Sequence, residues 1–134
     1  MNSVHRILQP ADWARPKGYA NGVASSGRTI YVAGQIGWDS QQQLVSDDLV
    51  AQARQALLNI VAILDVDGAK PEHIVRLTWY VTSRADYLAA AAPLGAAYRE
   101  VIGRHFPAMT AVEVSALMER GAVIEIEATA VIPD

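Results

Sequence analysis

The stretch that decides the fold is HFPAMTAVEVSALMERGAVIEIEATAV, residues 105–131. Hydrophobic and polar residues alternate on both sides of Met118-Glu119-Arg120-Gly121, and a period of two is typical of a half-buried strand. The four residues between the two runs predict a turn, because glycine adopts positive φ without strain. We therefore expect a hairpin whose second strand carries Glu125 and Glu127 on one face, about 7 Å apart. Such a pair of carboxylates marks either a solvated surface or the edge of a site.

A second hairpin is expected near the start of the chain, after an irregular arm formed by residues 1–17. Its strands are Tyr19–Ala24 and Thr29–Ala33, and the cluster Ser-Ser-Gly-Arg between them predicts the turn. Gly34 and Gly37 follow the second strand. Glycines there indicate either a bulge at the strand end or a place where a ligand can approach the backbone.

The first expected helix begins near Leu49 and ends before Gly68, which would serve as its terminal glycine. Ser46 or Asp47 can accept a hydrogen bond from the first turn. The hydrophobic residues recur at intervals of three and four, as in a helix that covers one face of a sheet. The polar residues Gln52, Arg54, Gln55 and Asn59 fall mostly on the opposite face.

A central strand and a second helix are expected after the first helix. Residues 74–82 alternate and contain two aromatic residues, which favours a central strand. Ser83 can cap a helix that continues to Gly103, and Pro93 should kink or restart that helix. The predicted order is ββαβαββ, an α+β sheet with two helices on one face.

Composition restricts the class of protein. The 134 residues predict a single domain, residues 1–134, with 51% hydrophobic residues; this apolar excess suggests that another subunit covers part of the surface. The net charge of −3 and the scattered 11 Lys and Arg argue against a nucleic-acid partner. No apolar run suggests a signal peptide or a membrane span, so we expect a cytoplasmic protein without a membrane partner.

No metal or cofactor is expected. The absence of cysteine excludes disulfides, thiolate nucleophiles and Cys-ligated metals. His5, His73 and His105 lack the spacing of metal ligands and are interpreted as structural. Phosphate-binding and serine-hydrolase motifs are also missing.

Three segments, in the same order, resemble the YjgF/YER057c/UK114 family, also called Rid (reactive intermediate deaminase). The first segment begins at Phe106 and ends with the strand IEIEA. Tyr31–Ile36, YVAGQI, is similar to the family's IYVSGQI, and Gln52–Ile60 is similar to its Q-T/A-R-Q-A-L-x-N-I/L helix. The resemblance implies the chorismate-mutase-like (YjgF/L-PSP) fold. It also implies a homotrimer, with bare sheet faces turned inward and three clefts between subunits that bind a small metabolite.

The resemblance also implies site residues. Glu125 matches the glutamate that positions or activates the water attacking a C=N carbon, a role that requires hydrogen-bond reach of that water. Tyr19 matches a tyrosine that lines the cleft, Gly34 and Gln35 match its S-G-Q segment, and Thr110 could donate to a ligand.

One position departs from the family pattern. Deaminating members carry, after Phe-Pro-Ala, an arginine that holds the substrate carboxylate; here that position is Met109. Methionine makes no salt bridge, so another cation would have to replace it, with Arg15, Arg104 and Arg120 as candidates, or the cleft would take a less acidic or neutral ligand against an apolar wall.

Three functions are therefore open. The first is a hydrolase of enamine or imine intermediates, and the second is a non-catalytic binder or sensor of a small molecule. A weaker third is an RNA-directed endoribonuclease or translation inhibitor, against which the acidic pI of about 5.5 counts.

Overall fold

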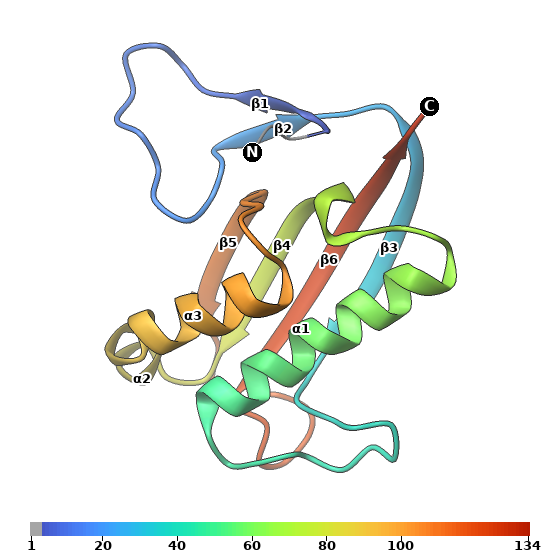
Figure 1. The fold of residues 1–134 in the computed structure, drawn as a ribbon. Coiled ribbons are helices and arrows are strands. Elements are labelled where there is room, and N and C mark those ends of the chain that lie inside the picture. Colours follow the sequence, from blue (N-terminus) through green and yellow to red (C-terminus); the bar gives the residue numbers. More distant parts are fainter. Residues whose placement is uncertain (1–3) are drawn as a thin grey trace.

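The computed structural model describes residues 4–134, and its main feature is a four-stranded mixed sheet covered by helices on one face (Figure 1). A separate two-stranded sheet lies beside one end of it. In chain order the elements are β1 (Arg6–Leu8), β2 (Gly22–Ala24), β3 (Gly27–Gln35), α1 (Leu49–Val66), the 3-10 turn η1 (Pro71–His73), β4 (Ile74–Val81), α2 (Arg84–Ala89), α3 (Ala91–Val101), β5 (Ala108–Glu113) and β6 (Ile124–Pro133).

The strand order in the large sheet is β3-β6-β4-β5. β6 lies between β3 and β4 and is antiparallel to both, whereas β4 and β5 are parallel. The predicted α+β class, with helices packed on one face of the sheet, is therefore confirmed.

The predicted hairpin between residues 105 and 131 is wrong. Both strands exist, but β4 separates them, and β5 runs parallel to β4 instead of folding back against β6. The chain after β5 continues along β4 through a bond from the Val114 amide to the Val81 carbonyl (2.8 Å), and the following loop then crosses to the far side of β4. Alternation in a sequence identifies a strand and its buried face, but not the partner with which it pairs.

The predicted N-terminal hairpin is also wrong. β2 pairs with β1, which lies in the arm where no strand was expected, and β3 pairs with β6. The backbone changes direction at Gly27, whose φ is +139°. A Cβ at Gly27 would overlap the Ile132 carbonyl, so the close approach of β3 to the end of β6 requires glycine.

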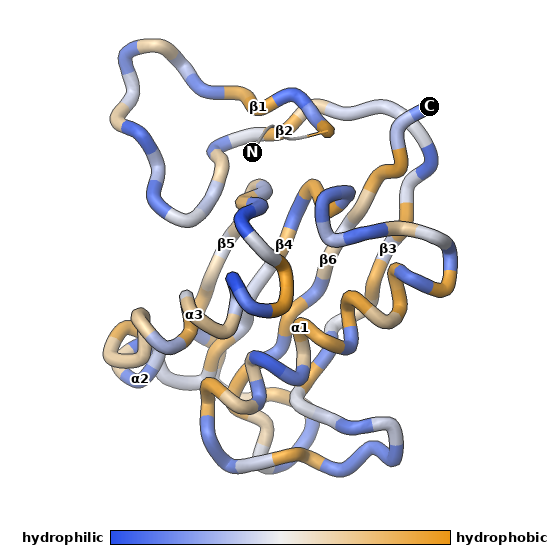
Figure 2. Tube along the Cα trace, in the orientation of Figure 1, coloured by the Kyte–Doolittle hydropathy of each residue, from blue (hydrophilic) through white to orange (hydrophobic). Residues whose placement is uncertain are grey.

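Hydrophobic side chains from β6 and β4 meet α1 and α3 to form the core. Leu57, Ile60 and Leu64 of α1 are almost fully buried, and so are Ile124 and Ile126 of β6. Figure 2 shows hydrophobic segments interleaved with hydrophilic ones along α1. By length and composition alone this helix could cross a membrane; in the fold, one face of it packs on the sheet.

The helix boundaries largely follow the predicted signals. Asp48, rather than Ser46 or Asp47, caps α1 by accepting a bond from the Ala51 amide (2.9 Å). Ser83 caps α2 as expected. The chain restarts as α3 after Ala90, and Pro93 lies in the first turn of α3, where its missing N–H breaks no helical hydrogen bond.

Gln52 is fully buried, contrary to its expected place on the outer face of the first helix. Its Nε2 donates to the carbonyls of Ser46 and Gly121, and its Oε1 accepts from the amide of Val123, all at 2.9 Å. One side chain of α1 therefore holds both the loop before that helix and the loop that leads into β6.

We predict that Gln52→Leu lowers the free energy of unfolding by about 2–4 kcal/mol, because it removes three hydrogen bonds that this buried side chain makes to two carbonyls and one amide. Chemical denaturation would measure the change. Gln55→Leu is the matched control, since among the residues described the Gln55 amide bonds only to Asn59, one turn along the helix (2.9 Å); its cost should be about 1 kcal/mol or less. Equal costs would contradict the assigned role of Gln52.

A second prediction concerns pH. Burial lowers the pKa of His105, whose Nε2 donates to the Ile74 carbonyl (2.7 Å). The folded state keeps His105 neutral while the unfolded chain takes up a proton, so stability should fall as the pH decreases below about 6.5. His105→Gln retains a donor for Ile74 and should reduce this slope in denaturation curves measured between pH 7.5 and 5. An unchanged slope would show that other groups cause the pH dependence.

Candidate functional site

Glu125 lies near the start of β6, on the sheet face opposite the helices, beside the end of β3. The β3–β6 register shifts between Val32 and Gln35, and Gly34 falls in that irregular segment. A Cβ at Gly34 would overlap the Glu125 carboxylate and would lie 2.8 Å from its Cδ. Gly34 therefore lies at a bulge near the strand end, the first of its two expected roles, and it allows the Glu125 carboxylate to lie against the β3 backbone.

The Glu125 carboxylate lines an open hollow of about 410 Å³. Within residues 4–134, this carboxylate makes no hydrogen bond or ion pair, so its oxygens can accept from water or a ligand. Glu119 contributes a second carboxylate to the hollow, and none of its described lining residues is a cation. The lining residues are Gly34, Gln35, Ile36, Trp38, Gln42, Met118, Glu119 and Glu125.

Glu127 shares the sheet face of Glu125 but has a different environment. Its Oε1 accepts a hydrogen bond of 2.6 Å from the Tyr80 hydroxyl on β4. This bond, with desolvation, raises the pKa of Tyr80. Glu127 is thus engaged within the sheet, whereas Glu125 is not.

The other predicted site residues do not join Glu125 within one chain. Met109 is on β5 and lines a different hollow, on the helix-covered face beside Trp79 and Phe106. Thr110 is exposed and lies opposite Thr78 on the open face.

Tyr19 is 39% exposed and precedes Ala20, which bridges to Ala108 at the start of β5. The structure therefore brings Gly34, Gln35 and Glu125 together, and leaves Tyr19, Met109 and Thr110 near β5. The separation arises because β4 lies between β5 and β6, the same feature that made the predicted hairpin wrong.

None of the arginines proposed as replacements lines either hollow: Arg15, Arg104 and Arg120 are exposed elsewhere. Instead, Lys17 and Arg99 line the hollow that contains Met109. The sequence carried no signal for this arrangement, because residues 17, 99 and 109 belong to three segments that only the fold brings together.

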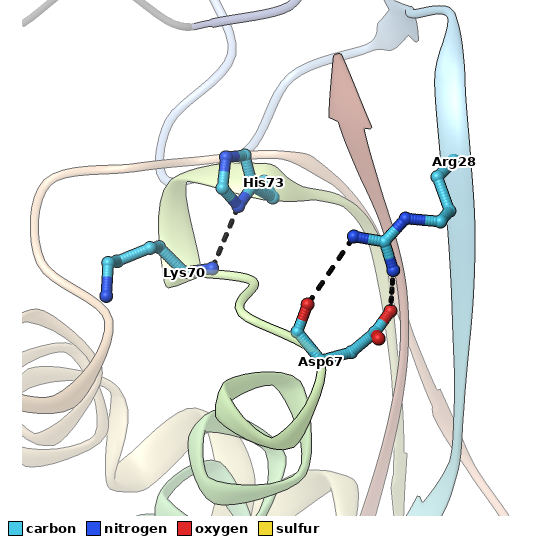
Figure 3. Close-up of polar contacts among 4 residues, drawn as sticks. All are labelled: Arg28, Asp67, Lys70 and His73. Atoms are coloured by element: carbon cyan, nitrogen blue, oxygen red, sulfur yellow. Dashed lines mark hydrogen bonds and ion pairs between the residues drawn. The ribbon is translucent and has the colours of Figure 1, made fainter. Parts of the chain in front are cut away.

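The histidines have structural contacts. His73 Nδ1 accepts from the Lys70 amide (2.8 Å), next to the Arg28–Asp67 ion pair (Figure 3). His5 Nε2 donates to the His73 carbonyl (3.0 Å). His105 was expected to cap the end of the second helix; its ring bonds to Ile74 at the start of β4. No group of three or more potential metal ligands occurs in the part of the chain that the structure describes.

The fold and the Glu125 hollow define a class: small α+β proteins with a mixed sheet, helices on one face and a carboxylate beside a glycine at a strand end. A family model described as Endoribonuclease L-PSP matches residues 12–132. The chain belongs to this family, the YjgF/YER057c/UK114 or Rid family, as the sequence resemblance indicated.

Similar proteins and solved structures support this family assignment. The chain is 35% identical over 129 residues to a 2-iminobutanoate/2-iminopropanoate deaminase of Capra hircus, covering 96% of this chain and 90% of that one. It is 37% identical over 111 residues to the protein DfrA of Myxococcus xanthus, covering 79% and 78%. The crystal structure of a Rid-family protein of unknown function, YyfB from Yersinia pestis, matches with a TM-score of 0.82 at 37% identity, covering 96% of this chain and 98% of that one.

We predict that Gly34→Ala displaces the Glu125 carboxylate without unfolding the protein, because the added methyl meets the flexible end of a side chain. The side-chain carboxyl ¹³C resonance of Glu125 should shift, while the melting temperature changes by only a few degrees. Gly37→Ala is the contrasting control: its methyl would lie 2.7 Å from the Gln52 Cα, which is backbone, and should cost about 1–3 kcal/mol. An unmoved Glu125 resonance would contradict the contact.

Proposed function

We propose that this Rid-family protein binds a small metabolite and hydrolyses an enamine or imine, with Glu125 positioning the attacking water. The observation that carries the proposal is the half-buried carboxylate of Glu125, held against Gly34 in an open hollow and free of hydrogen bonds within residues 4–134. Relatives that span most of the chain are named as deaminases of 2-imino acids, which supports this class of reaction.

The proposed chemistry requires neither metal nor cofactor. Glu125 accepts a hydrogen bond from water and takes its proton as the oxygen attacks the C=N carbon. The nitrogen takes up a proton from solvent to give a carbinolamine. Glu125 then gives its proton to that nitrogen as the C–N bond breaks, and the carbinolamine hydroxyl loses its proton to solvent as the C=O bond forms. The products are a carbonyl compound and ammonia, so the elements of one water molecule are consumed.

We propose further that the active assembly is a homotrimer whose clefts lie between subunits. The open sheet face supports an assembly of this kind: it carries Tyr31, which is 80% exposed, and Val112, which is 41% exposed. Large apolar side chains on a sheet face opposite the helices favour coverage by another subunit. Glu125 and Glu127 share this face, so the proposed clefts would border it.

A non-catalytic binder of a small molecule is the second candidate function. Met109 favours it, because a thioether replaces the cation that would hold a substrate carboxylate and lies in a different hollow from Glu125. Both candidates predict ligand binding, and only the first predicts turnover.

The test is hydrolysis of freshly generated 2-iminopropionate, and of the corresponding neutral imino amide, by the wild-type protein, Glu125→Gln and Glu127→Gln. We expect Glu125→Gln to lower the rate by about 100-fold or more, because it loses the base. Glu127→Gln is the matched control on the same strand and face, and should remain within a few-fold since glutamine still accepts from Tyr80.

Analytical ultracentrifugation accompanies the assay, and each protein should have three times the chain mass of 14.4 kDa. Unaltered hydrolysis by Glu125→Gln would overturn the role of that residue. No acceleration of either substrate by an intact trimer would favour the binder, and a monomer at working concentration would overturn the proposed assembly.

A further inference from the structure

The N-terminal arm, residues 4–24, is attached to the rest of the fold at few points (Figure 1). β1 is exposed along its length, and Trp13, in the loop between β1 and β2, is 59% exposed. Between residues 4 and 21 only two residues are buried, His5 (8% exposed) and Ala20 (6%). A segment with so little buried surface can separate from the body while the core stays folded.

These two buried residues join the arm to neighbouring segments of the body. The His5 ring donates from Nε2 to the carbonyl of His73, at the end of η1 (3.0 Å). The Ala20 amide donates to the carbonyl of Pro107, just before β5 (3.0 Å). Of the two contacts, only the one made by His5 contains titratable groups, so only that contact can respond directly to pH.

All three histidines of the chain meet at the His5 contact. His105 donates from Nε2 to the carbonyl of Ile74, the residue after His73 (2.7 Å), so two rings bind consecutive carbonyls. The third ring, that of His73, accepts at Nδ1 from the Lys70 amide (2.8 Å; Figure 3). This last bond requires an unprotonated Nδ1, because a protonated ring nitrogen is a donor.

The surroundings of the three rings oppose positive charge. Burial is the main cause that lowers the pKa of His105, and the neighbouring His5 and His73 add to it. The bond to Ile74 and the charge of Glu72 act in the opposite direction. Three charged rings would therefore repel one another in a partly dehydrated site.

The other ionisable side chains on the elements around the rings give little compensation for added protons. Arg28 and Asp67 pair with each other. Burial raises the pKa of Tyr98, whose hydroxyl donates to the His105 carbonyl and adds no charge. β2, and β6 where it passes η1, contribute no ionisable side chain. Three cations stand against the carboxylate of Glu72: Arg6 of β1, Lys70 beside η1 and Arg104 next to His105.

We propose that the cluster of His5, His73 and His105 is a pH-sensitive switch, which holds the arm on the body while its rings are neutral and releases it when they are protonated. The docked state binds fewer protons than the released state, so docking weakens as the pH falls through the range of about 8 to 5 in which histidine ordinarily changes charge. Each ring that takes up a proton on release lowers the docking equilibrium by up to about tenfold per pH unit.

Release of the arm alters the hollow that contains Met109. Lys17 and Gly18 of the arm line that hollow, and Tyr19 lies between them and the buried Ala20. The arm does not line the hollow of Glu125, so the inference does not rest on the reaction proposed there. The switch couples pH to the shape of one wall of the Met109 hollow.

Heteronuclear ¹H–¹⁵N NOE values of the full chain, recorded from pH 7.5 to 5, test the switch. The values for residues 6–18 should fall as the pH decreases, while those of α1 and β6 stay constant, because the arm leaves and the core remains folded. Arg15→Gln is the control within the arm: it removes an exposed charge from the loop and should release the arm at the same pH as the wild type.

Two variants keep the hydrogen bonds of the cluster without its titration. His5→Gln retains a donor for the His73 carbonyl, and His73→Asn retains an acceptor for the Lys70 amide. Each should lower the slope of the docking equilibrium by about tenfold per pH unit, and the double variant should hold the arm at pH 5. Chemical denaturation at pH 7.5 verifies the fold, and the single variants replace the double variant if it does not fold.

Three results would overturn the proposal. The first is an arm whose NOE values stay constant from pH 7.5 to 5. The second is release by the folded variants that equals release by the wild type. The third is loss of the α1 and β6 signals at the same pH as the arm, which would indicate global unfolding.

Discussion

β6 pairs with β3 on one side and β4 on the other, and its side chains point alternately to the two faces of the sheet. Ile124 and Ile126 face the helices and are fully buried, so Glu125 and Glu127 are directed to the opposite face. A shift of one residue in register would place both carboxylates in the core, where an unpaired charge is far too costly. The hydrophobic core therefore fixes the position of Glu125 without any contact to the carboxylate itself.

Gln52 fixes the loop that leads into β6. Its three hydrogen bonds hold Ser46 before α1 and hold Gly121 and Val123 just before the strand begins. A buried side-chain amide with all of these partners satisfied specifies one loop arrangement, because any other leaves donors and acceptors unpaired. Gly37 packs against the backbone of Gln52, so the segment after β3 is held by the same residue. Both walls of the Glu125 hollow are thus anchored to α1.

Sequence patterns predicted which segments form helices and strands better than they predicted which strands pair. Alternation located β4 and β6, and capping residues located the helices, because both signals are local. Alternation placed the first strand of the predicted C-terminal hairpin at residues 112–117, whereas β5 spans Ala108–Glu113. Strand pairing is not local, because the same alternation fits two strands that pair as a hairpin and two strands that are separated by a third, as β5 and β6 are by β4. Gln52 was placed on the solvent side because helical spacing treats every polar residue as outward-facing. The hollow that contains Met109 could not be predicted, since Trp79 of β4, Tyr98 of α3 and Phe106 of the segment before β5 are separated in the sequence.

The two hollows have opposite charge, and this constrains how an anionic substrate could reach Glu125. The Glu125 hollow carries a second carboxylate, Glu119, and no cation among its described lining residues, whereas Lys17 and Arg99 line the hollow that contains Met109. Two like charges a few ångströms apart in a partly enclosed site repel strongly. If Glu125 acts as proposed, the isolated fold favours a neutral imine or enamine beside it. On the same proposal, a substrate that bears a carboxylate requires a cation from a second chain, so its binding would depend on subunit assembly rather than on any residue of the isolated fold.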